Sequence, residues 1–269
     1  MPISDLQARI LKEISANRSP DSYLAGATVL HRRDDSPRFS QDLDFFHDIE
    51  DSVAESATQD AETLLQAGYH LEWLLRAPTF HRAVVAVGEQ QLKIEWAQDS
   101  AFRFFPVQED ARCGYRLHDA DAAVNKVLAL AGRSEVRDIV ETLHLHATLL
   151  SLGALAWAAC GKDPGFTPEL LLDQANRHAS YTQTDIDRLH LREPLDLTAL
   201  KGEWLAALKA ARDFVTTLPP TELGCLYLDV EHHPVTPDAV SSAFPNLTRH
   251  TGSTRGAWPT VSPYGGEAE

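Results

Sequence analysis

The sequence predicts an α+β protein with a mixed β-sheet core, flanking helices and a mainly helical C-terminal region. Two observations support this class. Helical and strand-like patterns alternate along the first hundred residues, whereas long helical patterns dominate after about Leu117. We therefore expect an α/β core over residues 1–117 and a helical domain over residues 118–269, which ends in a short mixed tail from residue 225.

The elements of the core are placed by apolar spacing and by turn residues. Gly26 ends the first strand. The third helix is expected to be capped by Asp51 or Ser52 and to stop at Gly68, and the connection Gly88-Glu89 is short enough for a hairpin between two strands. Helices are expected over residues 6–14, 27–31 and 51–66, and strands over residues 22–25, 43–46, 69–75, 80–87 and 91–96.

The second half contains apolar residues at helical spacing. Thr167 before Pro168 is a strong start signal, because a capping hydroxyl precedes a proline in the first turn. Helices are expected over residues 119–131, 135–150, 152–160, 168–178, 184–189 and 197–218, and one strand over residues 225–230. This half is therefore predicted to be mostly helical.

Composition limits the possible classes of protein. The chain has 269 residues, 43% of them hydrophobic, and no stretch of about 20 apolar residues, so we expect no membrane span, no signal peptide and a cytoplasmic location. Its three cysteines, Cys113, Cys160 and Cys225, are isolated, which argues against disulfides and a thiolate zinc site. A net charge of −15 opposes general binding of polyanions but not of a small anionic ligand at a metal ion or a helix N-terminus.

Two acidic residues alternate in the segment 38–46. On a strand, Asp42 and Asp44 would point to the same face, about 7 Å apart along the backbone. Convergent carboxylates suit Mg²⁺ or Mn²⁺, the ions that phosphoryl and nucleotidyl transfer require. The alternative is a pair of solvated acids on an edge strand, but Phe45 and Phe46 indicate that the other face of this strand is buried.

A strand, a glycine and a helix start follow one another at residues 23–28. Gly26 and Ala27 would present free backbone N–H groups, and Thr28 a hydroxyl, to a triphosphate. Simple turn geometry is the alternative explanation. A later strand carries Lys93 and Glu95 on one face, where Glu95 would be a third carboxylate; an exposed polar face is the alternative.

Two charged residues stand out in the first helices of the second half. Lys126 lies in an apolar helical stretch, where a cation needs a partner or an anionic ligand unless it extends to solvent. Asp138 lies near the start of the next helix, where it would be a helix cap, a salt-bridge partner or a catalytic acid.

Together these segments resemble the AbiEii/AbiGii-type toxin nucleotidyltransferases of the DNA-polymerase-β-like superfamily, over about Tyr23 to His146. The resemblance implies an NTP substrate, a nucleotidyltransferase-like sheet, metal binding by Asp42 and Asp44, and phosphate contact by Lys126. It implies that Gly26, Thr28 and Ser40 bind the nucleotide and that Asp138 is the last catalytic acid. We add Ala27, Arg38 and Lys93 as candidates for nucleotide binding, and Glu95 as the candidate third carboxylate. Ala27 departs from the family, which usually has glycine or serine there.

We rank three functions. The first is an enzyme that transfers a nucleoside monophosphate from an NTP to RNA, such as a tRNA 3′ end, as the toxin of a type IV toxin-antitoxin system or a relative, with a cognate antitoxin as partner. The second modifies a protein with AMP or phosphate, and the third binds nucleotide without catalysis. A zinc site is not expected, because neither His144 with His146 nor His232 with His233 has ligand spacing.

Overall fold

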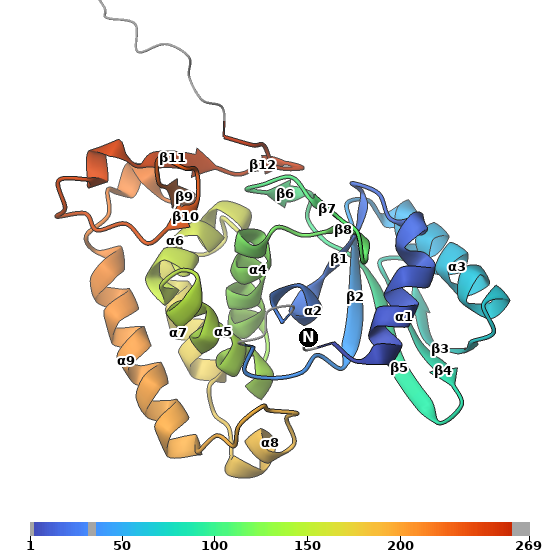
Figure 1. Cartoon of the computed structure of the whole chain (residues 1–269). Coiled ribbons are helices and arrows are strands. Elements are labelled where there is room, and N and C mark those ends of the chain that lie inside the picture. Colours follow the sequence, from blue (N-terminus) through green and yellow to red (C-terminus); the bar gives the residue numbers. More distant parts are fainter. Residues whose placement is uncertain (1–2, 32–35, 260–269) are drawn as a thin grey trace, which may run out of the picture.

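The computed structural model describes residues 3–31 and 36–259, and a seven-stranded mixed sheet forms its centre (Figure 1). The spatial order is β3 (His70–Ala77), β4 (Phe80–Val87), β5 (Gln90–Gln98), β2 (Asp42–His47), β1 (Ser22–Ala25), β8 (Gly114–Arg116) and β7 (Gln108–Asp110). Strand β2 lies inside the sheet, parallel to β5 and antiparallel to β1. The mixed-sheet core expected from the sequence is confirmed.

Helices cover both sides of this sheet (Figure 1). On one side, α1 and α3 pack against β5, and on the other α2 packs against β1, β2 and α4. The helices of the first half are α1 (Asp5–Ile14), α2 (Gly26–Leu30) and α3 (Glu50–Gln66). Those of the second half are α4 (Asp119–Gly132), α5 (Val136–Thr148), α6 (Leu152–Lys162), α7 (Pro168–His178), α8 (Gln183–Asp187) and α9 (Leu197–Val215).

The two faces of β2 differ because side chains alternate along a strand. Leu43 and Phe45 are fully buried. Phe45 lies beside Trp96, whose indole N–H donates to Asp60 of α3, so this apolar face points towards α1 and α3. The opposite face of β2 therefore points towards α2 and α4.

The C-terminal strands connect the helical half to the sheet half (Figure 1). After a small sheet of β9 (Cys225–Leu228), β10 (Pro234–Val235) and β11 (Thr248–Thr251), strand β12 (Ser253–Thr254) pairs with β6 (Phe102–Arg103). Next to this pair, the His250 Nε2 atom lies 2.7 Å from the Phe104 carbonyl oxygen. The end of the predicted tail thus returns to the first half of the chain.

Most predicted elements are present, and several details differ. Residues 22–25, 80–87 and 168–178 form the expected elements, and the Thr167 hydroxyl caps α7. The expected cap of α3 is wrong, because the helix begins at Glu50 after Ile49, which has no capping side chain. Residues 32–35, between the expected helix at 27–31 and the expected strand at 43–46, and residues 260–269 of the tail lie outside the described residues.

Within the part of the chain that the structure describes, no single helix is both long and apolar enough to cross a membrane. Only α5 and α6 together reach the required length and composition, and they are bent by 111° at their junction. Cys113, Cys160 and Cys225 are buried free thiols.

A buried histidine at the end of β2 makes the stability depend on pH. Burial, with a smaller effect of Arg18, lowers the pKa of His47 to about 4, and Ser22 Oγ lies 3.1 Å from its Nε2 atom. Below the ordinary pKa of 6.5 the unfolded chain binds a proton at His47 that the folded chain does not, so the contribution of His47 to stability falls as the pH falls. We expect this contribution to fall by about 1.5 kcal/mol between pH 6.5 and 5, measured by urea unfolding as the difference between the wild-type protein and a variant without His47.

Substitution tests this assignment. The unfolding free energy of His47→Gln relative to wild type should rise as the pH falls from 6.5 to 5, because the variant lacks the His47 contribution, whereas His70→Gln, at an exposed position of β3, should follow the wild-type profile. Parallel profiles for all three proteins would contradict the assignment to His47.

Candidate active site

The three predicted carboxylates lie on adjacent strands of the sheet. Parallel pairing of β2 with β5 sets Asp42 beside Lys93 and Asp44 beside Glu95. Since Leu43 and Phe45 point to α1 and α3, all four charged side chains share the face that points towards α2 and α4. The shared face of Lys93 and Glu95 expected from the sequence is therefore present, and the pairing adds both residues to the row of Asp42 and Asp44.

Cations surround these carboxylates. The Lys93 Nζ atom lies 3.0 Å from Asp42 Oδ2 and 3.0 Å from Glu95 Oε1. Arg82 Nε donates to Glu95 Oε1 at 2.8 Å, and Arg137 Nη1 lies 3.5 Å from Asp42 Oδ2. In the protein alone, an ammonium group thus occupies the position between two carboxylates where a divalent cation would be attracted.

The two aspartates have opposite electrostatic environments. Burial would raise the pKa of Asp42, but Lys93, Arg137 and Arg38 hold it below its ordinary value. The pKa of Asp44 is raised to about 7 by burial and by the negative charges of Asp42 and Glu95. A proton therefore partly neutralises Asp44 near neutral pH, and a bound cation would favour its ionised form.

A cavity of about 250 Å³ opens between this face of the sheet and helices α4 and α5. Of the predicted site residues, those that line it are Gly26, Ala27, Arg38, Asp42, Asp44, Glu95 and Lys126. Four others do not line it but contact Asp42 or Lys126, which do: Thr28, Ser40, Lys93 and Asp138. The remaining lining residues are Phe46, Phe80, Ala97, Ala122, Asn125, Ala129, Arg133 and Arg137.

Phe46 corrects one expectation from the sequence. The sequence pattern suggested that Phe45 and Phe46 together mark the buried side of the strand. Phe45 does so, but Phe46 lies two residues beyond Asp44 and lines the cavity. One end of the cavity is therefore charged and the other is apolar.

Gly26 joins β1 to α2 directly behind Asp44. Its φ is +64°, a backbone conformation that favours glycine, and an added Cβ would lie 1.9 Å from Asp44 Oδ2. Ala27 is not among the described residues with positive φ, so its departure from the family pattern requires no unusual backbone conformation. The turn needs glycine at one position only, and the chain has it there.

Thr28 and Ser40 hold the start of β2 in place. The Thr28 hydroxyl lies 2.9 Å from Ser40 Oγ and 2.8 Å from the Asp42 carbonyl oxygen. The Gln7 side chain also donates to the Ser40 and Asp42 carbonyl oxygens, at 3.2 and 3.3 Å. Both hydroxyls thus contact the backbone that carries Asp42.

Lys126 and Asp138 form a buried ion pair across α4 and α5. Lys126 Nζ lies 2.9 Å from Asp138 Oδ1, and Arg133 Nε lies 2.7 Å from Asp138 Oδ2. Asp138 has no exposed surface and lies outside the cavity lining, so its contacts are those of a residue that positions two cations. A catalytic role for Asp138 remains a prediction.

Glu141 is a site residue that the sequence analysis missed. It lies one turn after Asp138, with its Oε2 atom 2.6 Å from Lys126 Nζ and its Oε1 atom in an ion pair with the Arg38 guanidinium. His31 Nε2 lies 3.0 Å from the same Oε1 atom. The spacing of three residues from Asp138 on one helix face was the only signal in the sequence.

These charges stabilise one another. Burial would lower the pKa of Lys126, but Glu141 and Asp138 raise it, and burial would raise the pKa of Glu141, but Lys126, His31 and Arg38 hold it far below its ordinary value. Lys126 is thus held charged at the cavity wall, and Arg38 is held beside it by its ion pair with Glu141. Two cations with fixed positions suit a ligand with several negative charges.

Replacing Glu141 by glutamine should destabilise the protein by about 3 kcal/mol, because a buried cation pair loses a counter-charge. The free energy of unfolding in urea measures the loss. Glu203→Gln, at an exposed position of α9, is the matched control and should change stability by less than about 0.5 kcal/mol. An equally small loss for Glu141→Gln would contradict the ion-pair network.

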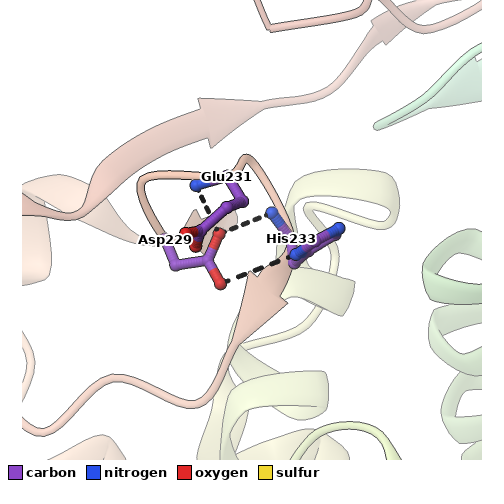
Figure 2. A group of neighbouring side chains, drawn as sticks. All are labelled: Asp229, Glu231 and His233. Carbon is purple, nitrogen blue, oxygen red and sulfur yellow. Dashed lines mark hydrogen bonds and ion pairs between the residues drawn. The ribbon is translucent and has the colours of Figure 1, made fainter.

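A second group of side chains of the types that bind metal ions lies on the turn after β9, distant in the sequence from the residues that line the cavity (Figure 2). Asp229, Glu231 and His233 offer donor atoms within 4.8 Å of one another. Asp229 Oδ1 accepts the backbone N–H groups of Glu231 and His233, at 3.0 and 2.8 Å, and the last two side chains are exposed. These contacts are those of an aspartate-stabilised surface turn.

The fold is similar to that of several solved structures. No protein-family model matches the sequence, and no curated protein matches it. Among solved structures, the nucleotidyltransferase toxin MenT4 from Mycobacterium tuberculosis is similar, with a TM-score of 0.57 and 18% identity over 80% of this chain and 83% of that chain.

Two structures from Helicobacter pylori are similar as well. JHP933 has a TM-score of 0.50 and 18% identity, over 80% of this chain and 95% of that chain. A protein proposed to be a nucleotidyltransferase has a TM-score of 0.52 and 18% identity, over 80% of this chain and 99% of that chain. This chain therefore has the nucleotidyltransferase fold.

Proposed function

We propose that this protein is a metal-dependent nucleotidyltransferase that moves a nucleoside monophosphate from an NTP to an acceptor hydroxyl. The observation that carries the proposal is the cavity itself, where three carboxylates on adjacent strands face the cations of α4, α5 and the segment before β2. The similarity of the fold to nucleotidyltransferases adds support. A sheet face with a purely structural role would not be expected to combine this cavity with this fold.

The donor set fits a divalent metal ion. Asp42, Asp44 and Glu95 offer carboxylate oxygens on one face of the sheet, and hard oxygen ligands suit Mg²⁺ or Mn²⁺. Such an ion would neutralise phosphate charge and lower the pKa of the acceptor hydroxyl. Metal binding would release Lys93 from its position between Asp42 and Glu95, which frees its ammonium group for a phosphate oxygen.

Cationic side chains would orient the triphosphate. Lys126 and Arg38 are held by Glu141, while Arg133 and Arg137 line the same cavity. The acceptor hydroxyl loses its proton to solvent water, its oxygen forms a bond to the α-phosphorus, the bond from that phosphorus to the bridging oxygen breaks, and pyrophosphate leaves with the electron pair. The fixed positive charges stabilise the charge that develops on the leaving group.

For the acceptor we propose RNA, with a tRNA 3′ end as the specific case, and for the biological role a toxin or a relative of one. The MenT4 structure is that of a nucleotidyltransferase toxin, and the sequence segments resemble the AbiEii/AbiGii-type toxins. A toxin of this kind would have a cognate antitoxin. The strong negative charge of the chain favours a protein acceptor as the second candidate.

Incubation with Mg²⁺, NTPs labelled at the α-phosphate, and either total RNA or a mixture of cellular proteins separates the candidates. We expect label on RNA of tRNA size. Label on protein alone would replace the RNA acceptor by the second candidate. Nucleotide binding without transfer to either acceptor would contradict the proposed activity and support a non-catalytic binding protein.

A further inference from the structure

We propose that the apolar end of the cavity holds the base of the NTP, and that the Asn125 side-chain oxygen accepts a hydrogen bond from an N–H group of that base. This inference rests on the proposed function, since it assigns the substrate part that the charged end of the cavity leaves unplaced. It makes Asn125 a residue that distinguishes nucleotides whose base carries an N–H group at its edge from nucleotides whose base lacks one.

The sheet side of this end is apolar. Phe46 of β2 and Phe80 of β4 are both register partners of Ala97 of β5, so the three residues form a row across the sheet. This row follows the row of Asp44 and Glu95 by two residues, or about 7 Å along the strands, on the same face. Half-buried aromatic rings therefore begin where the carboxylates end, at a distance suited to the sugar and base of a nucleotide.

The helix side leaves room for a planar ring. Ala122, Asn125 and Ala129 of α4 line the cavity at positions separated by three, four and seven residues, which places them on one helix face. Lys126 follows on the same side, nearer the charged end. Small side chains facing two phenylalanines form a slot in which a base would contact apolar surface on both sides.

Asn125 is held in one orientation. Its Nδ2 group donates to Asp99 Oδ2 at 3.2 Å, and Asp99 is in turn fixed by Lys162, whose Nζ atom lies 2.7 Å from the same oxygen. Asp99 Oδ2 accepts from both Lys162 Nζ and Asn125 Nδ2, so the amide nitrogen faces Asp99 and the amide oxygen faces away from it. The assignment of oxygen and nitrogen in this amide is therefore chemically determined.

The Asn125 oxygen is a buried acceptor without a hydrogen-bond partner among the described residues. A buried polar atom of this kind carries a free-energy cost unless a ligand or water satisfies it. Other atoms of Asn125 line the cavity, so a base that displaces the side chains covering this oxygen would supply the missing donor. The slot thus recognises a flat ring that carries an N–H group at its edge, and all four RNA bases meet this description.

Nucleotides without such a donor provide the test in the unmodified protein. Equilibrium binding with Mg²⁺ should show zebularine triphosphate, which lacks both the N3–H and the amino group, binding about tenfold more weakly than CTP. Purine riboside triphosphate should likewise bind about tenfold more weakly than ATP. Tripolyphosphate serves as the probe of the charged end alone.

Equal affinity within both pairs would overturn the inference, as would binding of tripolyphosphate with no added affinity for any NTP. In Asn125→Ala the difference within each pair should disappear while tripolyphosphate affinity is unchanged, and Asn246→Ala, at an exposed position, should retain the difference. Transfer activity is measured separately, so a protein that discriminates the analogues but transfers nothing would contradict only the proposed function.

Discussion

Replacing Asp44 by asparagine should lower the rate of nucleotide transfer by about a thousandfold or more. The substitution keeps the shape of the side chain but removes one of three carboxylates that face the cavity, and metal-ion stabilisation of a phosphoryl transition state is worth about 4 kcal/mol. Transfer of label from an NTP labelled at the α-phosphate, followed over time at saturating Mg²⁺, measures the rate.

A matched carboxylate provides the control for this substitution. Asp51 is exposed in the first turn of α3, and Asp51→Asn should transfer label at the wild-type rate. The Asp44→Asn protein should also fold, because loss of a charge among like charges relieves repulsion. A folded Asp44→Asn protein with more than about a tenth of the wild-type rate would contradict the metal site.

The second large effect is expected at Gly26. In Gly26→Ala the new methyl group would lie 1.9 Å from Asp44 Oδ2 and 2.7 Å from Asp44 Cγ, so the carboxylate or the turn must move. A displacement of about 1 Å at a reacting centre costs about a hundredfold in rate. The positive φ adds about 1 kcal/mol of backbone strain. We therefore expect at least a hundredfold loss of transfer together with a small loss of stability.

Gly88 separates these two contributions. Its φ is +57°, and an added Cβ would meet no atom within 4 Å. Gly88→Ala should thus lose about 1 kcal/mol of stability and keep its transfer rate. Equal transfer rates in the two variants would show that the contact between Gly26 and Asp44 does not shape the active site.

Much of the fold follows from local patterns in the sequence. Strand β4 and helix α7 match their predicted ranges because alternation, apolar spacing and a Thr-Pro start signal act within a few residues. Strands β6, β7 and β8 were not predicted. They have only two or three residues each, too few for a periodic pattern, and pairing with distant segments defines them.

The geometry of the candidate site was predictable to the same extent. The shared face of Asp42 and Asp44, and that of Lys93 and Glu95, could be predicted because alternation on a strand fixes the face of each side chain. The parallel pairing that brings Glu95 beside Asp44 is a tertiary feature that no local pattern contains. Glu141 and its ion pair with Arg38, 103 residues away in the sequence, were missed for the same reason.

The most direct test of the proposed function compares one NTP labelled at the α-phosphate with the same NTP labelled at the γ-phosphate. With purified protein, Mg²⁺ and total RNA, we predict that the α-label becomes attached to RNA while the γ-label is released as pyrophosphate, and that chelation of Mg²⁺ stops both. Attachment of the γ-label to any acceptor, or transfer that persists in Asp44→Asn, would contradict a nucleotidyltransferase at this site.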